Sequence, residues 1–398
     1  PVATAPAPAS PVAVPPQDPP KPGTHADITS PPAFVDQDCG SAPPFSLTYL
    51  EGMPNWKVIQ NLTVARIMRN QYVSDCDNRR FVIAKIASQG MMYNFLWFQD
   101  VLAYALLTNR TMLVHTWGKS WTYARDKFCE VGGVMQTWNC FFEPVSSCPL
   151  PPLDQYVCWN SPKAEATKVV VVGQTPKMKC GFFVPHWLPT LKKDVAHKLD
   201  YFSRTQFVRF FFRLEARVKA HVAAVKQALN GTLDGAYHGI HVRVGDKHTE
   251  NAPKEFPRYL RQLRQLPPLN ATVKTIFLAS DDPAVVEQAL ADPQGYTIVT
   301  NPFEERRSGG QWNQNHLLGR VNATEHVLNF LTDVYLLSEA TYFVGTQSSN
   351  VGNAVIELLC ARRGSIKWPG CFANTLDGVK FSSANHGLLD GPHWSRDR

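Results

Sequence analysis

The sequence predicts an α/β protein with two Rossmann-like domains that face each other across a cleft, the second domain being a doubly wound parallel sheet. Three observations support this fold class. Apolar runs of strand length alternate with helical patterns along most of the chain. The β-α units of the second half repeat regularly, which is typical of a parallel sheet with helices on both faces. At 398 residues and 44% hydrophobic content, the chain is long enough for two domains with real cores.

The first half contains the less regular set of predicted elements. An apolar helix lies between two buried strands, and a region rich in Trp, Cys and Pro follows before another buried strand. In order, these are strand 80–87, helix 95–107, strand 111–115, the irregular stretch 117–158 and strand 169–172. A long amphipathic helix over 204–229, ending near Asn230 and Gly231, leads into the second half.

In the second half, four predicted strands alternate with four predicted helices. The elements are, in order, strand 238–244, helix 254–266, strand 275–279, helix 284–291, strand 296–299, helix 324–340, strand 342–345 and helix 350–361. Asp282 precedes Pro283 and is positioned to cap the helix that follows. The sequence contains no internal repeat, no P-loop and no Gly-x-Gly-x-x-Gly signature.

Composition sets the outer boundaries of the two domains. Residues 1–32 contain eleven prolines, which favours an extended, solvated linker over a packed core. Both a stalk between a membrane anchor and a folded body and a disordered chain end have this composition. We assign residues 1–38 to this stem or linker, 39–200 to the first domain, 201–365 to the second domain and 366–398 to a C-terminal tail.

The cysteines and the glycosylation sequons both indicate an oxidising, secretory compartment. Seven of the nine cysteines fall within the first 180 residues, and no pair has the Cys-x-x-Cys spacing of zinc ligands. Disulfides that tie an irregular region together are the favoured interpretation, and buried free thiols are the alternative. Five Asn-x-Thr sequons begin at Asn61, Asn109, Asn230, Asn270 and Asn322.

The charge distribution restricts the expected partners. The net charge of +7 is spread along the chain without a run of five or six basic residues, so nucleic acid is not favoured. A locally basic cleft for a small anionic substrate agrees equally well with this charge. No run of about 18 apolar residues is present. Because the sequence starts at Pro1 and not at Met, we expect a fragment whose signal peptide or membrane anchor lies upstream.

Residues 238–250 form the most informative stretch, because a predicted buried strand carries polar side chains on one face. A central parallel strand is covered on both faces and is expected to be apolar, yet His241 and Arg243 alternate with its apolar residues. An unpaired buried Arg is costly, and ligands in open α/β sheets bind beyond the carboxyl ends of strands. We therefore predict that Arg243 meets an anion such as a diphosphate. A buried interdomain ion pair is the alternative.

Two further stretches are candidates for nucleotide recognition. Residues 345–350, Gly-Thr-Gln-Ser-Ser-Asn, join a strand to a helix, where hydroxyls and backbone N–H groups can bind phosphate oxygens. Ordinary helix capping by Ser349 or Asn350 is the alternative. Asp333 lies in a helix rich in apolar residues, so its carboxylate needs a partner or a position that faces a cleft. It can accept the two N–H donors of a guanine edge or form a structural salt bridge.

Three charged residues follow the strand that carries Arg243, namely Asp246, Lys247 and Glu250. An acid at this position can take a proton from a sugar hydroxyl. Charges that follow a strand are otherwise simply solvated, which is the alternative for each of the three.

Together these motifs resemble the α1,6-fucosyltransferase family, which includes the enzymes that add core fucose to N-glycans and the nodulation fucosyltransferases. Residues 241–247, His-Val-Arg-Val-Gly-Asp-Lys, are similar to the family's His-Val-Arg-Arg-x-Asp-Lys. Further matches are residues 279–283 (Ala-Thr-Asp-Asp-Pro in the family), 332–338 (Leu-Asp-Ile-x-x-Leu-Ser), 346–349 (Thr-Phe-Ser-Ser) and, in residue type, 138–148 and 203–211. The similarity spans roughly residues 75–365.

The resemblance implies a GT-B-like fold, a GDP-fucose donor, inversion at the sugar carbon and no divalent metal ion. It places Arg243 on the β-phosphate, and His241 and Asp333 on the guanosine part. It makes Glu250 the base on the acceptor hydroxyl, supported by Asp246 and Lys247. The diphosphate contacts would come from Thr346, Ser348 and Ser349, and Tyr259 and Asp282 match further family residues of the donor site.

The chain departs from the family pattern at several positions. Val244 replaces the second arginine of the Arg-Arg pair, and the interval from Asp246 to Glu250 is one residue shorter. Gly345 and Gly352 stand where animal members carry a cysteine pair. The tail after residue 365 is too short for the family's SH3-like domain, and the long helical stem is missing, so the acceptor can differ from the chitobiose core of an N-glycan.

We therefore predict an inverting fucosyltransferase that transfers L-fucose from GDP-fucose to a glycan hydroxyl, by resemblance the 6-position of the N-glycan core GlcNAc. Its expected partners are the donor and a glycan or glycoprotein acceptor, and its expected location is the Golgi lumen, held by an upstream type II membrane anchor. One alternative is a relative with another donor or acceptor, as in cell-wall or peptide O-fucosylation. The other is a catalytically inactive glycan-binding protein.

Overall fold

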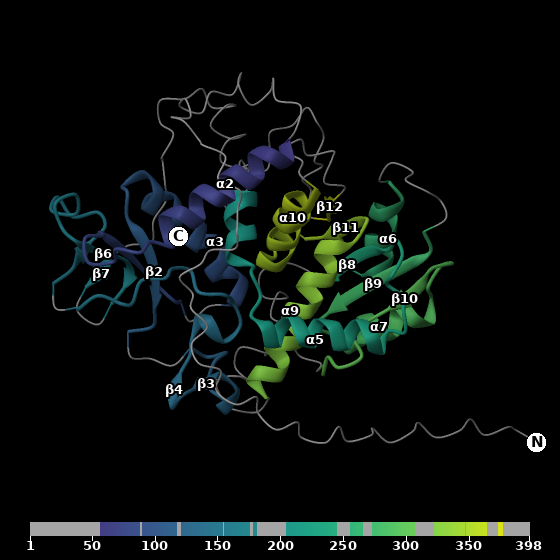
Figure 1. Ribbon diagram of the computed structural model, residues 1–398. Helices are drawn as coiled ribbons and strands as arrows, with labels where there is room; N and C mark the ends of the chain where they lie inside the picture. Colours follow the sequence, from purple (N-terminus) through teal and green to yellow (C-terminus); the bar gives the residue numbers. More distant parts are fainter. Residues whose placement is uncertain are drawn as a thin grey trace, which may run out of the picture. The chain divides into compact units, whose positions relative to one another are not determined.

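The computed structural model describes residues 56–87, 90–117, 121–153, 155–175, 178–180, 204–244, 255–265, 273–306, 322–346, 348–363 and 373–376. Contacts divide the chain into Pro1–Pro43 and Pro44–Arg398, and every described residue belongs to the second unit. The described residues form two parallel sheets with helices packed on them, and one small antiparallel hairpin (Figure 1). The predicted α/β class with parallel, Rossmann-like sheets is confirmed.

The first sheet has the strand order β2-β1-β6-β5, with all neighbours on this path parallel. Its strands are β1 (Phe81–Lys85), β2 (Thr111–His115), β5 (Val157–Cys158), β6 (Val169–Gln174) and β7 (Lys179–Cys180), the last running antiparallel to β6. The central strand β1 is apolar at successive positions because both of its faces are covered. Val82 and Ala84 belong to one hydrophobic cluster, and Phe81 and Ile83 to another.

Helix α3 (Met91–Leu107) and helix α2 (Trp56–Gln71) contact this sheet (Figure 1). Helix α3 is almost fully buried, and its rings pack against Trp138 of the irregular stretch. That stretch contains only short elements: η1 (Lys127–Cys129), β3 (Glu130–Val131), β4 (Val134–Met135) and η2 (Trp138–Cys140). Its predicted irregularity is confirmed, whereas α2 was not predicted.

The single long helix predicted over 204–229 is wrong. Residues 204–211 are helical, and a second helix, α5, spans Ala216–Ala228. Between them the chain pairs with the segment 141–143: Leu214 forms a bridge with Phe142, and the Glu215 amide donates to the Phe141 carbonyl at 2.9 Å. The Glu215 side chain then accepts from the amide of Arg217 and caps α5. A distant segment therefore takes the backbone bonds that a continuous helix would need.

The second sheet has the strand order β10-β9-β8-β11-β12, and all of its pairs are parallel. The strands are β8 (His238–Val242), β9 (Thr275–Ser280), β10 (Thr297–Val299), β11 (Tyr342–Gly345) and β12 (Ala373–Thr375). The first four confirm the predicted strands. Strand β12 lies in the segment predicted as a tail, yet it pairs with β11 and extends the sheet. The strand order reverses between β8 and β11, which makes that position a topological switch point.

Helices cover both faces of the second sheet (Figure 1). They are α6 (Phe256–Arg264), α7 (Pro283–Ala291), α9 (Ala323–Glu339) and α10 (Asn350–Arg363). Ile240 and Val242 of β8 pack with α6 and α7 in one cluster. A Cβ atom built on Gly239 would lie 3.0 Å from Ala340 and 3.1 Å from Leu337, so the other face of β8 meets α9. By the alternation of a strand, His241 and Arg243 belong to the α9 face.

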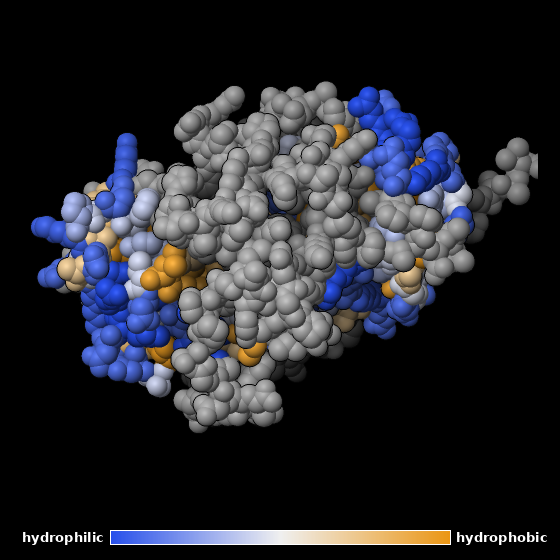
Figure 2. All heavy atoms as spheres, turned by 90° about the horizontal axis from the view of Figure 1, so that it is seen from above, coloured by the Kyte–Doolittle hydropathy of each residue, from blue (hydrophilic) through white to orange (hydrophobic). Residues whose placement is uncertain are grey.

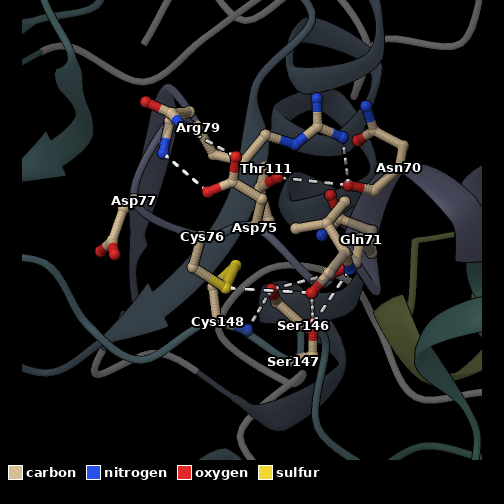
Figure 3. Close-up of a disulfide and its surroundings, with 12 residues drawn as sticks. Asn70, Gln71, Asp75, Cys76, Asp77, Arg79, Thr111, Ser146, Ser147 and Cys148 are labelled. Carbon is tan, nitrogen blue, oxygen red and sulfur yellow. Dashed lines mark hydrogen bonds between the residues drawn. A yellow bond between two sulfur atoms is a disulfide. The ribbon is translucent and has the colours of Figure 1, made fainter. Parts of the chain in front are cut away.

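Disulfides join cysteines of the first part of the chain, as predicted, in the pairs Cys76–Cys148, Cys129–Cys140 and Cys158–Cys180. Cys360 is disulfide-bonded as well. Figure 3 shows the Cys76–Cys148 bridge beside Ser146, whose hydroxyl donates to the Gln71 carbonyl at 2.8 Å. These bridges indicate an oxidising compartment.

The surface of the described residues is mostly hydrophilic on the face shown in Figure 2, with small hydrophobic patches near the middle. The sequon asparagines that the structure describes are exposed: Asn61, Asn109, Asn230 and Asn322. Among the described helices, none has the length and hydropathy needed to cross a membrane.

Candidate active site

The carboxyl ends of β8, β9 and β11 bring polar residues together at the switch point. Val242 of β8 pairs in register with Ser280 of β9, so the next residues of the two strands, Arg243 and Asp281, are neighbours. Thr346 follows β11 on the other side of β8. This is the edge where open α/β sheets bind ligands, and it contains the arginine that the sequence singled out.

Arg243 forms an ion pair with Asp281 through its Nη1 atom. The second carboxylate oxygen of Asp281 accepts the Val244 amide at 3.0 Å. The two side chains are 23% and 13% exposed, so the pair is partly accessible at the strand ends. The alternative interpretation of Arg243 was a buried interdomain ion pair. Arg243 does have an acidic partner, but this partner follows a strand of the same sheet and does not lie in the other domain.

Asp281 lies in the stretch 279–283 that matches the family, but a site role was expected only for Asp282. The two neighbouring aspartates have different contacts. The Asp282 carboxylate accepts the Ala284 amide at 2.8 Å and caps α7, as its position before Pro283 predicted. The parallel register of adjacent strands was the missing signal, because it places the residue after β9 beside the residue after β8.

His241 lies one strand position before Val242, and 7% of its surface is exposed. Burial, with the positive charge of Arg243 nearby, lowers its pKa to about 3. The imidazole is therefore neutral at physiological pH. Its Nδ1 atom has no hydrogen-bond partner among the described residues, so the ring carries a buried polar atom next to Arg243.

Helix α9 adds a second row of polar side chains on the face that meets β8. His326, Asn329 and Asp333 recur at helical spacing, and Asp333 is 8% exposed. The Asn301 side chain donates to the Asp333 carboxylate at 3.0 Å. Burial and the nearby Glu304 raise the pKa of Asp333 well above its ordinary value. No salt bridge to Asp333 is found among the described residues.

The loop from β11 to α10 is packed tightly against the first turn of that helix. Thr346 and Ser349 are buried, and the Ser349 amide donates to the Thr346 carbonyl at 3.3 Å. A Cβ atom at Gly352 would lie 2.2 Å from that same carbonyl oxygen. Gly352 is thus needed for the close approach of helix and loop, and the local path of the loop depends on it.

We expect the Gly352→Ala variant to be less stable by about 1–3 kcal/mol, which is the usual cost of overpacking. The added methyl must displace the Thr346 carbonyl, and this outweighs the gain of about 1 kcal/mol in helix propensity. Thermal unfolding checks the change. Gly235→Ala is the matched control, because nothing lies within 4 Å of a Cβ built there. Equal melting temperatures for the two variants would contradict the prediction.

Among the remaining predicted site residues, the structure places Tyr259 away from these side chains. Tyr259 is fully buried in the apolar cluster between α6 and the sheet, on the face opposite α9. Asp246, Lys247 and Glu250 lie outside the described residues. Ser348 is partly exposed in the loop before α10. The described part of the chain contains no group of His, Cys, Asp or Glu side chains suited to hold a metal ion.

The protein belongs to the class of Rossmann-like α/β proteins. Its parallel sheet has an arginine, an aspartate and a loop with hydroxyl groups at the switch point, where such proteins bind ligands. The family comparison makes this more specific. Residues 53–366 match the model of the alpha-(1,6)-fucosyltransferase N- and catalytic domains. The chain therefore belongs to the alpha-(1,6)-fucosyltransferase family, a family of glycosyltransferases, as the sequence motifs predicted.

Two curated relatives bear the name alpha-(1,6)-fucosyltransferase. The protein of Drosophila melanogaster is 27% identical over 320 residues, which cover 76% of this chain and 47% of the relative. The protein of Caenorhabditis elegans is 26% identical over 275 residues, which cover 64% and 44%. The chain thus spans about half the length of the curated relatives that it matches.

Solved fucosyltransferases show a looser likeness. NodZ alpha-1,6-fucosyltransferase co-crystallized with GDP has a TM-score of 0.39 and 15% identity, covering 70% of this chain and 92% of its own. POFUT1 in complex with GDP has a TM-score of 0.44 and 12% identity, covering 77% of this chain and 100% of its own.

Proposed function

We propose that this chain is an inverting fucosyltransferase that transfers L-fucose from GDP-fucose to a glycan hydroxyl. The observation that carries the proposal is the guanidinium of Arg243 at the switch point, in a chain of the alpha-(1,6)-fucosyltransferase family. In such a reaction the acceptor oxygen bonds to the anomeric carbon while the bond to the β-phosphate oxygen breaks. The electron pair stays on the departing GDP, and Arg243 neutralises the charge that grows there.

Asp281 supports this role by holding Arg243 in place. Its carboxylate pairs with the guanidinium and also accepts the Val244 amide, so the cation is oriented before the donor arrives. Preorganised charges cost no reorganisation during the reaction, which is why such a support increases their effect. Asp281 is therefore a positioning residue in this proposal.

The remaining residues of the donor and acceptor sites follow the family pattern. We propose that His241 and Asp333 contact the guanosine part, and that the loop hydroxyls bind the diphosphate. Glu250 takes the proton of the acceptor hydroxyl, with Asp246 and Lys247 next to it. The hydroxyls are those of Thr346, Ser348 and Ser349. Tyr259 and Asp282 also match family residues, but Tyr259 packs on the face opposite α9 and Asp282 caps α7, so we propose no direct contact of either with the donor.

Val244, which stands where the family has a second arginine, is no argument against activity. Its side chain packs against the apolar cluster of Ile240, Val242 and the helices α6 and α7. A side chain at this position therefore points to the face opposite Arg243. The α9 face therefore keeps Arg243, and the valine at position 244 takes no cation away from this face. This weakens the interpretation as an inactive glycan-binding protein.

The proposed location of the enzyme is the Golgi lumen, where a membrane anchor upstream of this chain would hold it. The proposed acceptor is a glycan or a glycoprotein. The disulfides and the exposed sequon asparagines support a secretory route. The proposed reaction uses the donor substrate without a divalent metal ion, since a guanidinium can supply the positive charge at the leaving group.

A thermal-shift comparison of nucleotides tests the proposed donor. In EDTA, GDP at about 100 times its Kd should stabilise the protein by about 2.7 kcal/mol, because it binds only the folded state. UDP and CDP at the same concentration should give smaller shifts. Transfer of fucose to a glycan in the same buffer tests the reaction. A shift that requires Mn²⁺, or one that is equal for all three nucleotides, would contradict the proposal.

A further inference from the structure

The loop Asn301–Arg306, which follows β10 at the carboxyl edge of the second sheet, is anchored to α9 on two sides. Asn301 is fully buried. Its side-chain NH₂ group donates to Asp333 at 3.0 Å, and its side-chain oxygen Oδ1 accepts the Phe303 amide at 3.0 Å. The Asn329 side chain donates to the Phe303 carbonyl at 2.8 Å. The loop is thus held beside Asp333 by a network built around the buried side chains of Asn301 and Asn329.

Glu304 of this loop carries a buried oxygen atom without a partner. Its side chain is 7% exposed, and one carboxyl oxygen lies 3.3 Å from Nδ1 of His326. The other oxygen, Oε2, has no hydrogen-bond partner among the described residues. A buried polar atom left unsatisfied costs about 1–3 kcal/mol. Such an atom in the middle of a polar cluster indicates a group that a ligand satisfies.

Glu304 interacts electrostatically with Asp281, the partner of Arg243, and with Asp333. Burial raises its pKa to about 8, and the nearby carboxylates of Asp281, Glu305 and Glu325 add to this, whereas Arg306 opposes it. The Asp333 carboxyl in turn has its pKa raised by Glu304. Glu304 is therefore close enough to both ends of the polar cluster to interact with each.

The chemistry of a nucleoside diphosphate decides which part of it Glu304 can face. A carboxyl oxygen next to the phosphates would add to the negative charge that Arg243 has to neutralise. The ligand part that suits Glu304 is one with N–H donors. Guanine offers its ring N1–H and the two hydrogens of its 2-amino group on one edge. A carboxylate such as that of Asp333 can accept the N1–H and one amino hydrogen, which leaves the second amino hydrogen for another acceptor.

We propose that Oε2 of Glu304 accepts a hydrogen bond from the 2-amino group of guanine and so selects guanine nucleotides at this site. The proposal rests on the proposed function, because it takes the diphosphate to be bound at Arg243. It makes Glu304 a specificity-determining residue, and it assigns the unpartnered oxygen a ligand.

The proposal is tested by removing each partner of the hydrogen bond in turn, first the 2-amino group of the nucleotide and then the carboxylate of Glu304. Inosine diphosphate lacks only the 2-amino group of GDP. The wild type should bind GDP about 10- to 150-fold more tightly than inosine diphosphate, as expected for a hydrogen bond to a charged group. Glu304→Ala should lose most of this preference, because only Asp333 then remains to accept from the 2-amino group. Glu305→Ala, at the exposed neighbouring position, should keep the preference. Calorimetric titration measures all six constants.

The outcomes separate this proposal from the proposed function. A wild type that binds GDP and inosine diphosphate equally would overturn the role of Glu304 without any variant, so the test holds even where a variant fails to fold. A preference that is unchanged in Glu304→Ala would also overturn it. A wild type that binds no guanine nucleotide would overturn the proposed donor, and with it this inference.

The pH dependence gives an independent readout. An ionised carboxylate is the stronger acceptor, and Glu304 is mostly protonated below pH 8 because its pKa is about 8. Loss of this proton therefore strengthens the hydrogen bond to the 2-amino group. The preference for GDP should rise between pH 6.5 and 8.5, whereas His326, with a pKa of about 4, stays neutral. Because burial and Glu304 also raise the pKa of Asp333, the same titration of Glu304→Ala is the control, and the rise should be smaller in this variant. A preference that falls with rising pH would contradict the assignment.

Discussion

Replacement of Arg243 by alanine should lower kcat by about 10²- to 10³-fold, which corresponds to about 3 kcal/mol of transition-state stabilisation. The guanidinium is partly exposed at the switch point and is oriented by Asp281, so it can act on the charge that develops on the leaving diphosphate. The measurement is the steady-state rate of fucose transfer from GDP-fucose. Because the effect is largest in the transition state, kcat should fall more than the affinity for GDP.

The controls for this variant separate chemistry from folding. Removing Arg243 leaves the Asp281 carboxylate with only the Val244 amide among the partners described above, so stability must be measured beside activity. Arg258→Ala removes an exposed arginine from α6, on the other face of the sheet, and should keep full activity. A kcat close to the wild-type value in Arg243→Ala would refute the assigned role.

Replacement of both Cys76 and Cys148 by alanine should destabilise the fold by about 4.4 kcal/mol in the chain-entropy model of a disulfide. The bridge closes a loop with a sequence separation of 72 residues, so the unfolded chain gains much freedom when it is lost. It also holds the end of α2 against Ser146 and Ser147, whose hydroxyls donate to the carbonyls of Gln71 and Val73 (Figure 3).

The bridge Cys158–Cys180 is a matched control, because it also joins a partly exposed cysteine to a buried one. Its sequence separation is 22 residues, so the same model gives a loss that is smaller by about 1 kcal/mol. Urea unfolding of the two double-alanine variants measures both. The reverse order of stability would contradict the chain-entropy account.

Most helices and strands of the second sheet were predictable because their signals are local. The strands His238–Val242, Thr275–Ser280 and Tyr342–Gly345 are short apolar runs, and Asp282 caps its helix through the next residues of the chain. The helix predicted over 204–229 failed for the opposite reason. Its interruption is caused by the pairing of Leu214 with Phe142, a contact between distant positions that helical periodicity cannot reveal.

The site residues also divide into those that the sequence could predict and those that it could not. Arg243 could be found from the sequence, because a cation in an otherwise apolar strand is unusual at any position along the chain. The family motif includes Asp281 but does not show that it pairs with Arg243, and nothing next to Glu304 in sequence distinguishes it from a solvated acid. Their importance comes from the parallel register of β8 and β9 and from the loop that Asn301 fixes beside α9.

The sequence by itself determined the α/β class, the family and the strand that ends in Arg243, because periodicity, composition and motif order are properties of neighbouring residues. Only the tertiary structure decided the order of the strands, the acid that pairs with Arg243 and the buried oxygen of Glu304. Register, burial and charge coupling act through space, and they join residues that the chain keeps far apart.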